Sequence, residues 1–539
     1  MRQFGFFKTR QPTTVINPLG IGHMRSAESE STVVIGRSDD LEKTVAIVLG
    51  QAQSEAKAVA VLPILGEDGF GKATLTQLIY TDARIQSHFQ VKSWVRVYDK
   101  LNIAHVTKSI TDLTTMGPVP VLMDAMDLIR QCLWAELTGK RYLLVLINVL
   151  NEKTDNWEQL KPVLDCGCPG IMILVTTRSF KVASIMGTMT EYILKELNDD
   201  DMWGIFRQRA FGMGVHEWPK LVEIGKQLMN KCCGSPLAAT ILGGSLSYKN
   251  DEREWLDVLE SNIWDDVAVD NQIVPVLKMG YLSSPSYMKR YFAICAIFPK
   301  DFEIDRDTLI ELWMAHSFIP SGGETEMEAK GIEVFNELAW RGFFQDVKKK
   351  RKKMGFIVCR MHDLIHDFEK SVVGSEYASL LNLYQQNNLS TETLHMSTCY
   401  KPGIVSILQR FSFIHTLLDF GYTVDLNERI IDYLRQSHLL DLSTANSLRA
   451  VSLYCTSISH IHDIPKILKH LRYLDLSDCS FSMELPESSS TLYSLQTLNL
   501  NNCRDLECLP KGMRHMRSLR YLYLDGCFVL GRALATWSW

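Results

Sequence analysis

The chain has 539 residues, which is too many for one ordinary hydrophobic core, so several domains are expected. Hydrophobic residues make up 46% and charged residues 22%, as in folded globular proteins, and a net charge of -5 excludes a basic field that would recruit nucleic acid. No apolar run reaches the ~18 residues of a membrane span and no secretory signal is recognisable, so an intracellular protein is predicted.

The first half of the chain changes from an irregular stretch to a regular alternation. Residues 1–32 show no sustained periodicity and predict a linker. From residue 33 to about 190, short apolar runs alternate with amphipathic stretches, as a parallel α/β sheet requires. Strands are expected at 59–65, 93–97, 142–147 and 171–175, with helices between them such as 74–80 and 123–137.

A glycine-rich segment follows the first of these runs and precedes an amphipathic stretch, which is the context of a phosphate-binding loop. Its glycines allow backbone N–H groups to converge on phosphate oxygens, and its lysine supplies a point charge. These residues are Gly66, Gly69, Gly71 and Lys72. A purely structural glycine turn is the alternative. The motif normally continues with a Ser or Thr that ligates magnesium, but Ala73 occupies that position.

Three neighbouring residues depart from an ordinary phosphate loop. Thr74 is rotated by roughly 100° around the helix from the magnesium-ligand position, so it cannot simply replace that ligand. A carboxylate on Asp68 facing phosphates would cost roughly 1–3 kcal/mol at an effective dielectric near 20, so we expect it to point outward. Pro63 lies inside an expected strand, where a central strand needs its N–H.

The apolar run at 142–147 follows a basic pair and has the form of a Walker B strand. Two acidic residues should end it, to hold the magnesium shell and polarise a water molecule. The chain has Ile147 and Asn148 there instead. Together with Ala73, these changes predict a degraded magnesium site and no catalytic residue. The thirteen cysteines also lack metal-ligand spacing, so we predict free thiols and no metal site.

Residues 191 to about 370 lose the strand runs, and their apolar residues recur at helical spacing. The only dense charge run, KKKRKK at 348–353, could be a nuclear-import signal or a contact with an anionic surface. We favour the alternative, a solvated hairpin turn between the apolar pairs on either side.

The C-terminal part is a repeat array with a period of 24 residues. The units LRYLDLSDC, LQTLNLNNC and LRYLYLDGC begin at Leu471, Leu495 and Leu519, and a looser copy begins at Leu448. This is the leucine-rich-repeat signature, a short strand with inward leucines followed by a polar turn. Because the chain stops at Trp539, just after a strand, we expect a shortened solenoid.

In this order the motifs resemble the NB-ARC domain and leucine-rich repeats of plant disease resistance proteins, over about residues 33–530. The resemblance rests on the phosphate loop, the Walker B strand and the repeats. It also rests on the segments 34–37 (VIGR), 89–97, 174–178 (LVTTR), 233–238 (CGSPLA), 291–300 and 361–364 (MHDL). Ser235 replaces the leucine usual in the fourth of these segments.

The resemblance implies a multidomain protein. It implies an α/β P-loop NTPase domain at 33–190, a helical domain at 191–275 and a winged-helix domain at 276–370. A connector at 371–389 and an α/β leucine-rich-repeat solenoid at 390–539 follow. It implies that Arg178 senses phosphate and that Pro236 and His362 clamp ADP. The implied nucleotide-binding residues are Val34, Ile35, Gly66, Gly69, Gly71, Lys72, Thr74, Arg178, Pro236 and His362. About 32 residues at the front cannot hold the family's usual helical signalling domain, so its absence is expected.

Three functions follow as hypotheses. The first is an ADP-binding (or ATP-binding) regulatory protein of plant defence that has lost hydrolysis. The second is a nucleotide-free scaffold or decoy that acts through its repeats, and the third is an active ATPase, which the missing acids disfavour. The expected partners are a pathogen effector or guarded host protein and other proteins of the family, with no specific nucleic acid. The expected location is cytoplasmic, with the nucleus as a further possibility.

Overall fold

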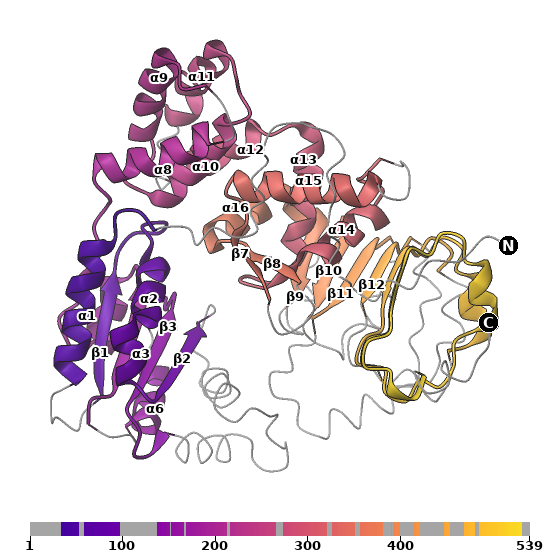
Figure 1. The fold of residues 1–539 in the computed structure, drawn as a ribbon, viewed down its shortest axis with the longest axis horizontal. Helices are drawn as coiled ribbons and strands as arrows, with labels where there is room; N and C mark the ends of the chain where they lie inside the picture. The colour runs from indigo at the N-terminus through magenta and orange to yellow at the C-terminus, as the bar shows by residue number, and fades with distance from the viewer. Residues whose placement is uncertain are drawn as a thin grey trace. The chain divides into compact units, whose positions relative to one another are not determined.

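The computed structural model divides the chain into two compact units, an N-terminal unit of residues 31–280 and a C-terminal unit that contains residues 281–539 (Figure 1). The residues it describes are 34–52, 59–97, 137–150, 152, 154–165, 169–212, 216–265, 273–320, 326–350, 356–380, 390, 392–398, 413–420, 447–452, 468–479 and 485–530. The predicted linker 1–32 and all but the last residue of the predicted helix 123–137 lie outside this part. Within it, no helix has the length and apolar character needed to cross a membrane.

The N-terminal unit is built on a parallel sheet with the strand order β2-β3-β4-β1-β5. The strands are β1 (Ala60–Leu65), β2 (Val91–Arg96), β3 (Tyr142–Ile147), β4 (Met172–Thr177) and β5 (Tyr192–Ile193). Strands β3 and β4 are buried along their whole length because helices cover both faces. The four strands predicted from apolar runs are therefore confirmed.

Two apolar cores lie on the two faces of this sheet. One packs α1 (Ser38–Ala52), α2 (Lys72–Thr81) and α3 (Ala83–His88) against β1, β3 and β4. The other packs α6 (Thr154–Leu164) and α7 (Phe180–Met186) against alternate residues of the same strands. The result is the doubly covered α/β architecture that the alternation of runs predicted.

Pro63 is tolerated in β1 because an N–H at this position would point away from β4, to the side where no strand pairs with this residue. The amides of Ala60 and Gly66 donate to β4 and its extension, while the amide of Val61 donates to Thr188 Oγ1 on the opposite side. Since alternate residues of a parallel strand donate to opposite sides, Pro63 belongs with Val61. On that side β5 pairs only with Ile64 and Leu65 of β1, so no ladder bond is lost at Pro63.

Helices continue the N-terminal unit beyond the sheet: α8 (Asp199–Phe211), α9 (Pro219–Asn230), α10 (Pro236–Leu246) and α11 (Glu252–Leu259), followed by α12 (Val274–Leu282), which crosses the boundary of the unit at residue 280. Aromatic rings hold them together, with Phe206 stacked on Trp203 and edge-on to the fully buried Trp255. Ser235 caps α10 by accepting a hydrogen bond from the amide of Ala238, with Pro236 at the first helical position. The predicted change to mostly helical structure is confirmed from α8 onward, but short strands also occur within the range 191–370, the first of them being β5.

The C-terminal unit begins with a winged-helix module. Its helices are α13 (Ser286–Ala293), α14 (Arg306–Ala315), α15 (Glu326–Trp340) and α16 (Asp363–Val373). Its antiparallel sheet has the order β6-β8-β7, formed by β6 (Ile304–Asp305), β7 (Gln345–Lys349) and β8 (Ile357–Arg360). The KKKRKK run starts in β7 and enters the connection to β8, so the favoured hairpin interpretation is confirmed for its described part.

Two lysines of that run, Lys348 and Lys350, are paired within the module. Glu303 lies 3.2 Å from Lys348 Nζ and 3.0 Å from Arg360 Nη2, and it also pairs with Lys350. Burial alone would raise the pKa of Glu303, but the lysine hydrogen bonds and charges outweigh it and lower the pKa to about 2.

In the described part of the repeats, seven strands form a parallel sheet in the order β15-β14-β13-β12-β11-β10-β9. The strands are β9 (Tyr377–Leu380), β10 (His395–Thr398), β11 (Thr416–Asp419), β12 (Ala450–Ser452), β13 (Tyr473–Asp475), β14 (Thr497–Asn499) and β15 (Tyr521–Tyr523). The register pairs Leu474 with Leu498 and Leu498 with Leu522, which confirms the 24-residue period. The sheet starts at β9, inside the range predicted as a connector.

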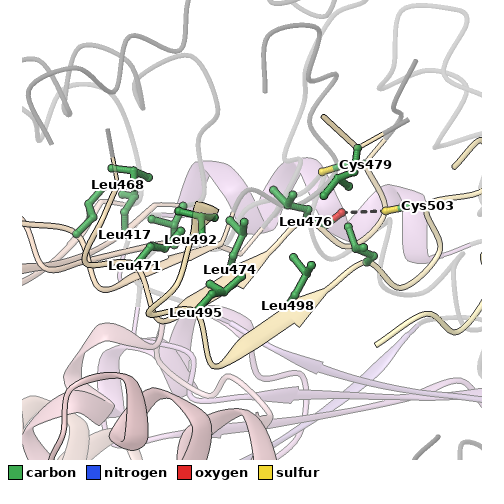
Figure 2. Packing of buried hydrophobic residues seen from close by; sticks show 14 of the residues in the cluster. Leu417, Leu468, Leu471, Leu474, Leu476, Cys479, Leu492, Leu495, Leu498 and Cys503 are labelled. Carbon is green, nitrogen blue, oxygen red and sulfur yellow. Dashed lines mark hydrogen bonds between the residues drawn. The ribbon is translucent and has the colours of Figure 1, made fainter. Parts of the chain in front are cut away.

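Leucines from successive units form the continuous core of the repeats (Figure 2). Leu474 and Leu498 point into it from adjacent strands. Cysteine thiols close the turns, since Cys503 Sγ donates to Leu476 O at 3.1 Å and Cys527 Sγ donates to Leu500 O at 2.9 Å. Each unit therefore buries its apolar residues only against its neighbours.

The same sheet contacts the winged-helix module through side chains outside the leucine core. Tyr521 donates a hydrogen bond of 2.6 Å to Glu328 of α15, and Tyr523 donates to the buried Glu311 of α14. His316, just after α14, lies 2.7 Å from Thr416 Oγ1 of β11, and burial lowers its pKa to about 3. The neutral imidazole of His316 and the two tyrosine–glutamate hydrogen bonds thus join the winged-helix module to the repeats.

The Glu303 pairs predict a stability that depends on pH. A carboxyl whose folded pKa is lowered stabilises the folded state above its unfolded pKa, and this contribution is lost as the pH falls toward the folded value. We expect Glu303→Gln to lower the free energy of unfolding by about 1–2 kcal/mol at pH 7, after discounting for the half-exposed lysines. The deficit should shrink between about pH 5 and pH 3, as measured by urea unfolding at several pH values.

Glu507→Gln is the matched control, because this exposed acid lies on the repeats. It should change the unfolding free energy by less than about 0.5 kcal/mol. A deficit for Glu303→Gln that stays constant from pH 7 to pH 3 would contradict the assignment.

Candidate phosphate-binding site

The phosphate loop joins the end of β1 at Leu65 to the start of α2 at Lys72. Gly69 and Gly71 have φ angles of 79° and 90°, in the left-handed region that side chains rarely adopt. The first turn of α2 therefore begins directly behind a loop of backbone amides. This arrangement of strand, glycine loop and helix N-terminus suits a bound phosphate group.

Side chains from distant parts of the unit bind the carbonyl oxygens of this loop. The buried Arg37 donates to Phe70 O at 2.7 Å and to Lys195 O at 2.9 Å, and pairs with Asp40 at 2.8 Å. Ser235 Oγ donates to Gly69 O at 3.2 Å. These bonds tie the loop to the start of α1 and to the start of α10.

Sequence reasoning missed both of these roles. Arg37 was recognised only as part of the VIGR segment, and Ser235 only as a departure from the family's usual leucine. A Ser just before a Pro and an apolar helical stretch is a recognisable helix cap, and that signal could have singled out Ser235. The hydrogen bonds of Arg37 had no comparable local signal.

Lys72 directs its ammonium group back onto the loop. Its Nζ donates to Gly66 O at 2.7 Å and to Glu67 O at 2.8 Å, and lies 3.5 Å from Asp68 Oδ1. Burial lowers the pKa of Lys72, and the neighbouring Asp68 opposes that shift.

Asp68 does not point outward as expected. Its Oδ2 accepts a hydrogen bond of 2.7 Å from Arg178 Nη1, while its Oδ1 faces Lys72. The carboxylate has turned inward because two cations offer it better compensation than solvent does. This prediction was wrong because it considered phosphate repulsion and not the two cations.

The positions that should ligate magnesium carry no suitable group. Ala73 has no hydroxyl and packs against the apolar core, and Ile147 is a buried core residue at the end of β3. Asn148 adopts a φ of 59°, and its backbone N–H donates a hydrogen bond of 2.9 Å to Thr176 Oγ1. An alkyl group and a neutral amide do not fit the oxygen-rich, anionic shell that magnesium requires. Within the described ranges, no cluster of three or more His, Cys, Asp or Glu residues could hold a metal ion.

The structure brings several sequence-predicted site residues together. Gly66, Gly69, Gly71 and Lys72 form the loop, and Arg178 reaches it through Asp68. Pro236 lies between Ser235 and Leu237, whose amide is 3.5 Å from Gly69 O. Thr74, in the first turn of α2, lies beside Gly71. Ile35, which follows Val34 in the chain, packs near Gly204 of α8.

His362 belongs to the other unit. It is the N-cap of α16, where its Nδ1 accepts a hydrogen bond of 3.1 Å from the amide of Leu364. This cap gives the residue a local structural role in the winged-helix module. Its predicted contact with nucleotide stays a prediction.

Arg37 supports a prediction about the loop's stability. Arg37→Met leaves two carbonyl oxygens without this donor and removes the cation beside Asp40. We expect it to lower the free energy of unfolding by about 2–4 kcal/mol in urea denaturation.

Arg84→Met is the control, because Arg84 is half exposed and pairs with Glu42 and Asp82 at the surface. It should cost less than about 1 kcal/mol. Equal losses in the two variants would show that Arg37 has no special role.

Three family models match the chain in the order of its modules. The NB-ARC domain matches residues 41–216, the disease resistance protein winged helix domain matches 297–368, and the leucine rich repeat matches 470–492.

Several curated relatives are disease resistance proteins by name. The chain is 37% identical over 450 residues to putative disease resistance protein RGA1 of Solanum bulbocastanum, covering 82% of this chain and 42% of that protein. It is 42% identical to disease resistance protein RGA2 of the same species, covering 64% and 35%. It is 32% identical to putative disease resistance RPP13-like protein 1 of Arabidopsis thaliana, covering 87% and 44%. The chain thus spans less than half the length of each of these relatives.

Proposed function

Because the chain belongs to the NB-ARC leucine-rich-repeat family of disease resistance proteins, we propose that it acts in plant defence as an ADP-dependent clamp without magnesium-assisted hydrolysis. The chain itself would hold the nucleotide, and the winged-helix and repeat modules would respond to its presence.

One contrast within the site supports this proposal. The groups that would hold phosphate, the loop amides and Lys72, follow the end of β1. The groups that would hold magnesium and polarise a water molecule are replaced by Ala73, Ile147 and Asn148. A loop with a lysine can bind phosphate oxygens by charge-assisted hydrogen bonds, while cleavage of a phosphoanhydride also needs a positioned metal and water.

The clamp would act through residues next to the loop. Ser235 and Leu237 at the start of α10 contact Gly69, so a phosphate that orders the loop would also order α10. Pro236 would contact the nucleotide from this helix, and Val34 and Ile35 would lie near the adenine. His362 would contribute from the winged-helix module.

The second candidate is a nucleotide-free scaffold or decoy. Asp68 favours it, because a carboxylate of the chain itself pairs with the loop's lysine and with Arg178. In both cases we propose that an effector or a guarded host protein binds through the repeats, and that the protein acts in the cytoplasm or nucleus.

Nucleotide retention separates the two candidates. We expect the purified chain, once denatured, to release ADP in about equal amounts whether it was prepared with magnesium or with a chelator. Lys72→Ala should lose at least about tenfold in ADP affinity, since a charge-assisted contact contributes roughly 1.5–3 kcal/mol.

Lys161→Ala, on the exposed side of α6, is the control and should retain ADP like the unmodified chain. Absence of nucleotide, together with unchanged melting temperature and partner binding in Lys72→Ala, would favour the scaffold. ADP retention that requires magnesium would contradict the proposed loss of the metal site.

A further inference from the structure

We propose that Asp68 is an internal counter-anion of the phosphate loop, which occupies the loop's two cations and competes with the phosphates of the nucleotide. The proposal rests on the proposed function, since it assumes that nucleotide phosphates bind at Lys72. It adds a residue that sets how tightly they bind.

The carboxylate of Asp68 bridges the two cations from within the loop. Oδ1 lies 3.5 Å from Lys72 Nζ, and Oδ2 lies 2.7 Å from Arg178 Nη1. The Asp68 side chain is 18% exposed and that of Lys72 is 10% exposed, so solvent screens this pair less than a surface pair.

The donors of Lys72 are taken up by the loop itself. An ammonium group has three N–H donors; Lys72 donates to Gly66 O and Glu67 O, and its Nζ forms an ion pair with Asp68 Oδ1 at 3.5 Å. A phosphate that binds at this ammonium must displace one of these acceptors. Asp68 is the one whose loss also relieves repulsion, because it is the only anion among the three.

The same contact stabilises the empty loop. Without Asp68, Lys72 and Arg178 would face each other across the loop with no carboxylate between them. The carboxylate thus lowers the free energy of the nucleotide-free state and raises that of the bound state, where it faces negatively charged oxygens. Both effects weaken nucleotide binding.

The adjacent acid provides a matched control. Glu67 carries the same charge one residue earlier in the loop, but its side chain is exposed. Removing either carboxylate changes the net charge equally, so a general effect of charge would appear in both variants. An effect of the bridge would appear only at Asp68.

The test is a titration of the full chain with ADP, and separately with inorganic pyrophosphate, in the presence of a chelator. We expect Asp68→Asn to bind each at least tenfold more tightly than the unmodified chain, and Glu67→Gln to differ by less than twofold. Without ligand, Asp68→Asn should melt at a lower temperature than Glu67→Gln, and saturating ADP should reverse that order. Asp68→Gly is the second variant, in case the asparagine disturbs the loop.

Each outcome has a distinct meaning. If the unmodified chain and both Asp68 variants bind ADP equally, the counter-anion proposal is overturned and the proposed function stands. If only the Asp68 variants bind, the counter-anion proposal is supported and the ADP-dependent clamp is overturned for the natural chain. If no variant binds ADP or pyrophosphate, both are overturned.

Discussion

The phosphate loop is held from behind, by hydrogen bonds to its carbonyl oxygens. Arg37, Ser235 and Lys72 each donate to the backbone between Gly66 and Phe70, and they come from α1's start, α10's start and α2. A backbone carbonyl that accepts such a bond fixes the orientation of its peptide plane, and so directs the next N–H toward the open side. The loop's shape therefore depends on the helical part as much as on the sheet.

Holding a phosphate and cleaving it usually occur together in nucleotide-binding proteins, but they depend on different parts of the site. Holding a phosphate requires oriented amides and a positive charge, which the loop and its supports supply. Cleaving it requires ligands at the ends of neighbouring strands, where Ile147 instead completes the apolar core beneath α2. The first property depends on backbone geometry and the second on two or three side chains, so the second can be lost while the fold is unchanged.

The strands that could be predicted from the sequence are those marked by a local periodic pattern. The buried strands follow from apolar runs, and β13 to β15 follow from the leucines repeated every 24 residues. Strand β9 escaped prediction because its residues, YASL, lack the leucine pattern and are strand only through pairing with β10. The orientation of Asp68 depends on Arg178, 110 residues away, and the role of Arg37 depends on Lys195. No window of sequence contains such pairs.

Pro63 also has a consequence for the way the edge of the sheet is closed. Among the described residues, the sheet continues beyond β1 as the two residues of β5, so part of this side of β1 faces a loop and not a strand. A bare strand edge of six apolar residues would be a template for pairing with another chain. Pro63 removes a donor from that edge, and its ring packs where a side chain on Gly187 would lie. The loop residues Thr188 and Met189 already bind the backbone N–H and C=O groups of Val61, so this loop and β5 close the buried edge of β1, and Pro63 adds no donor between them.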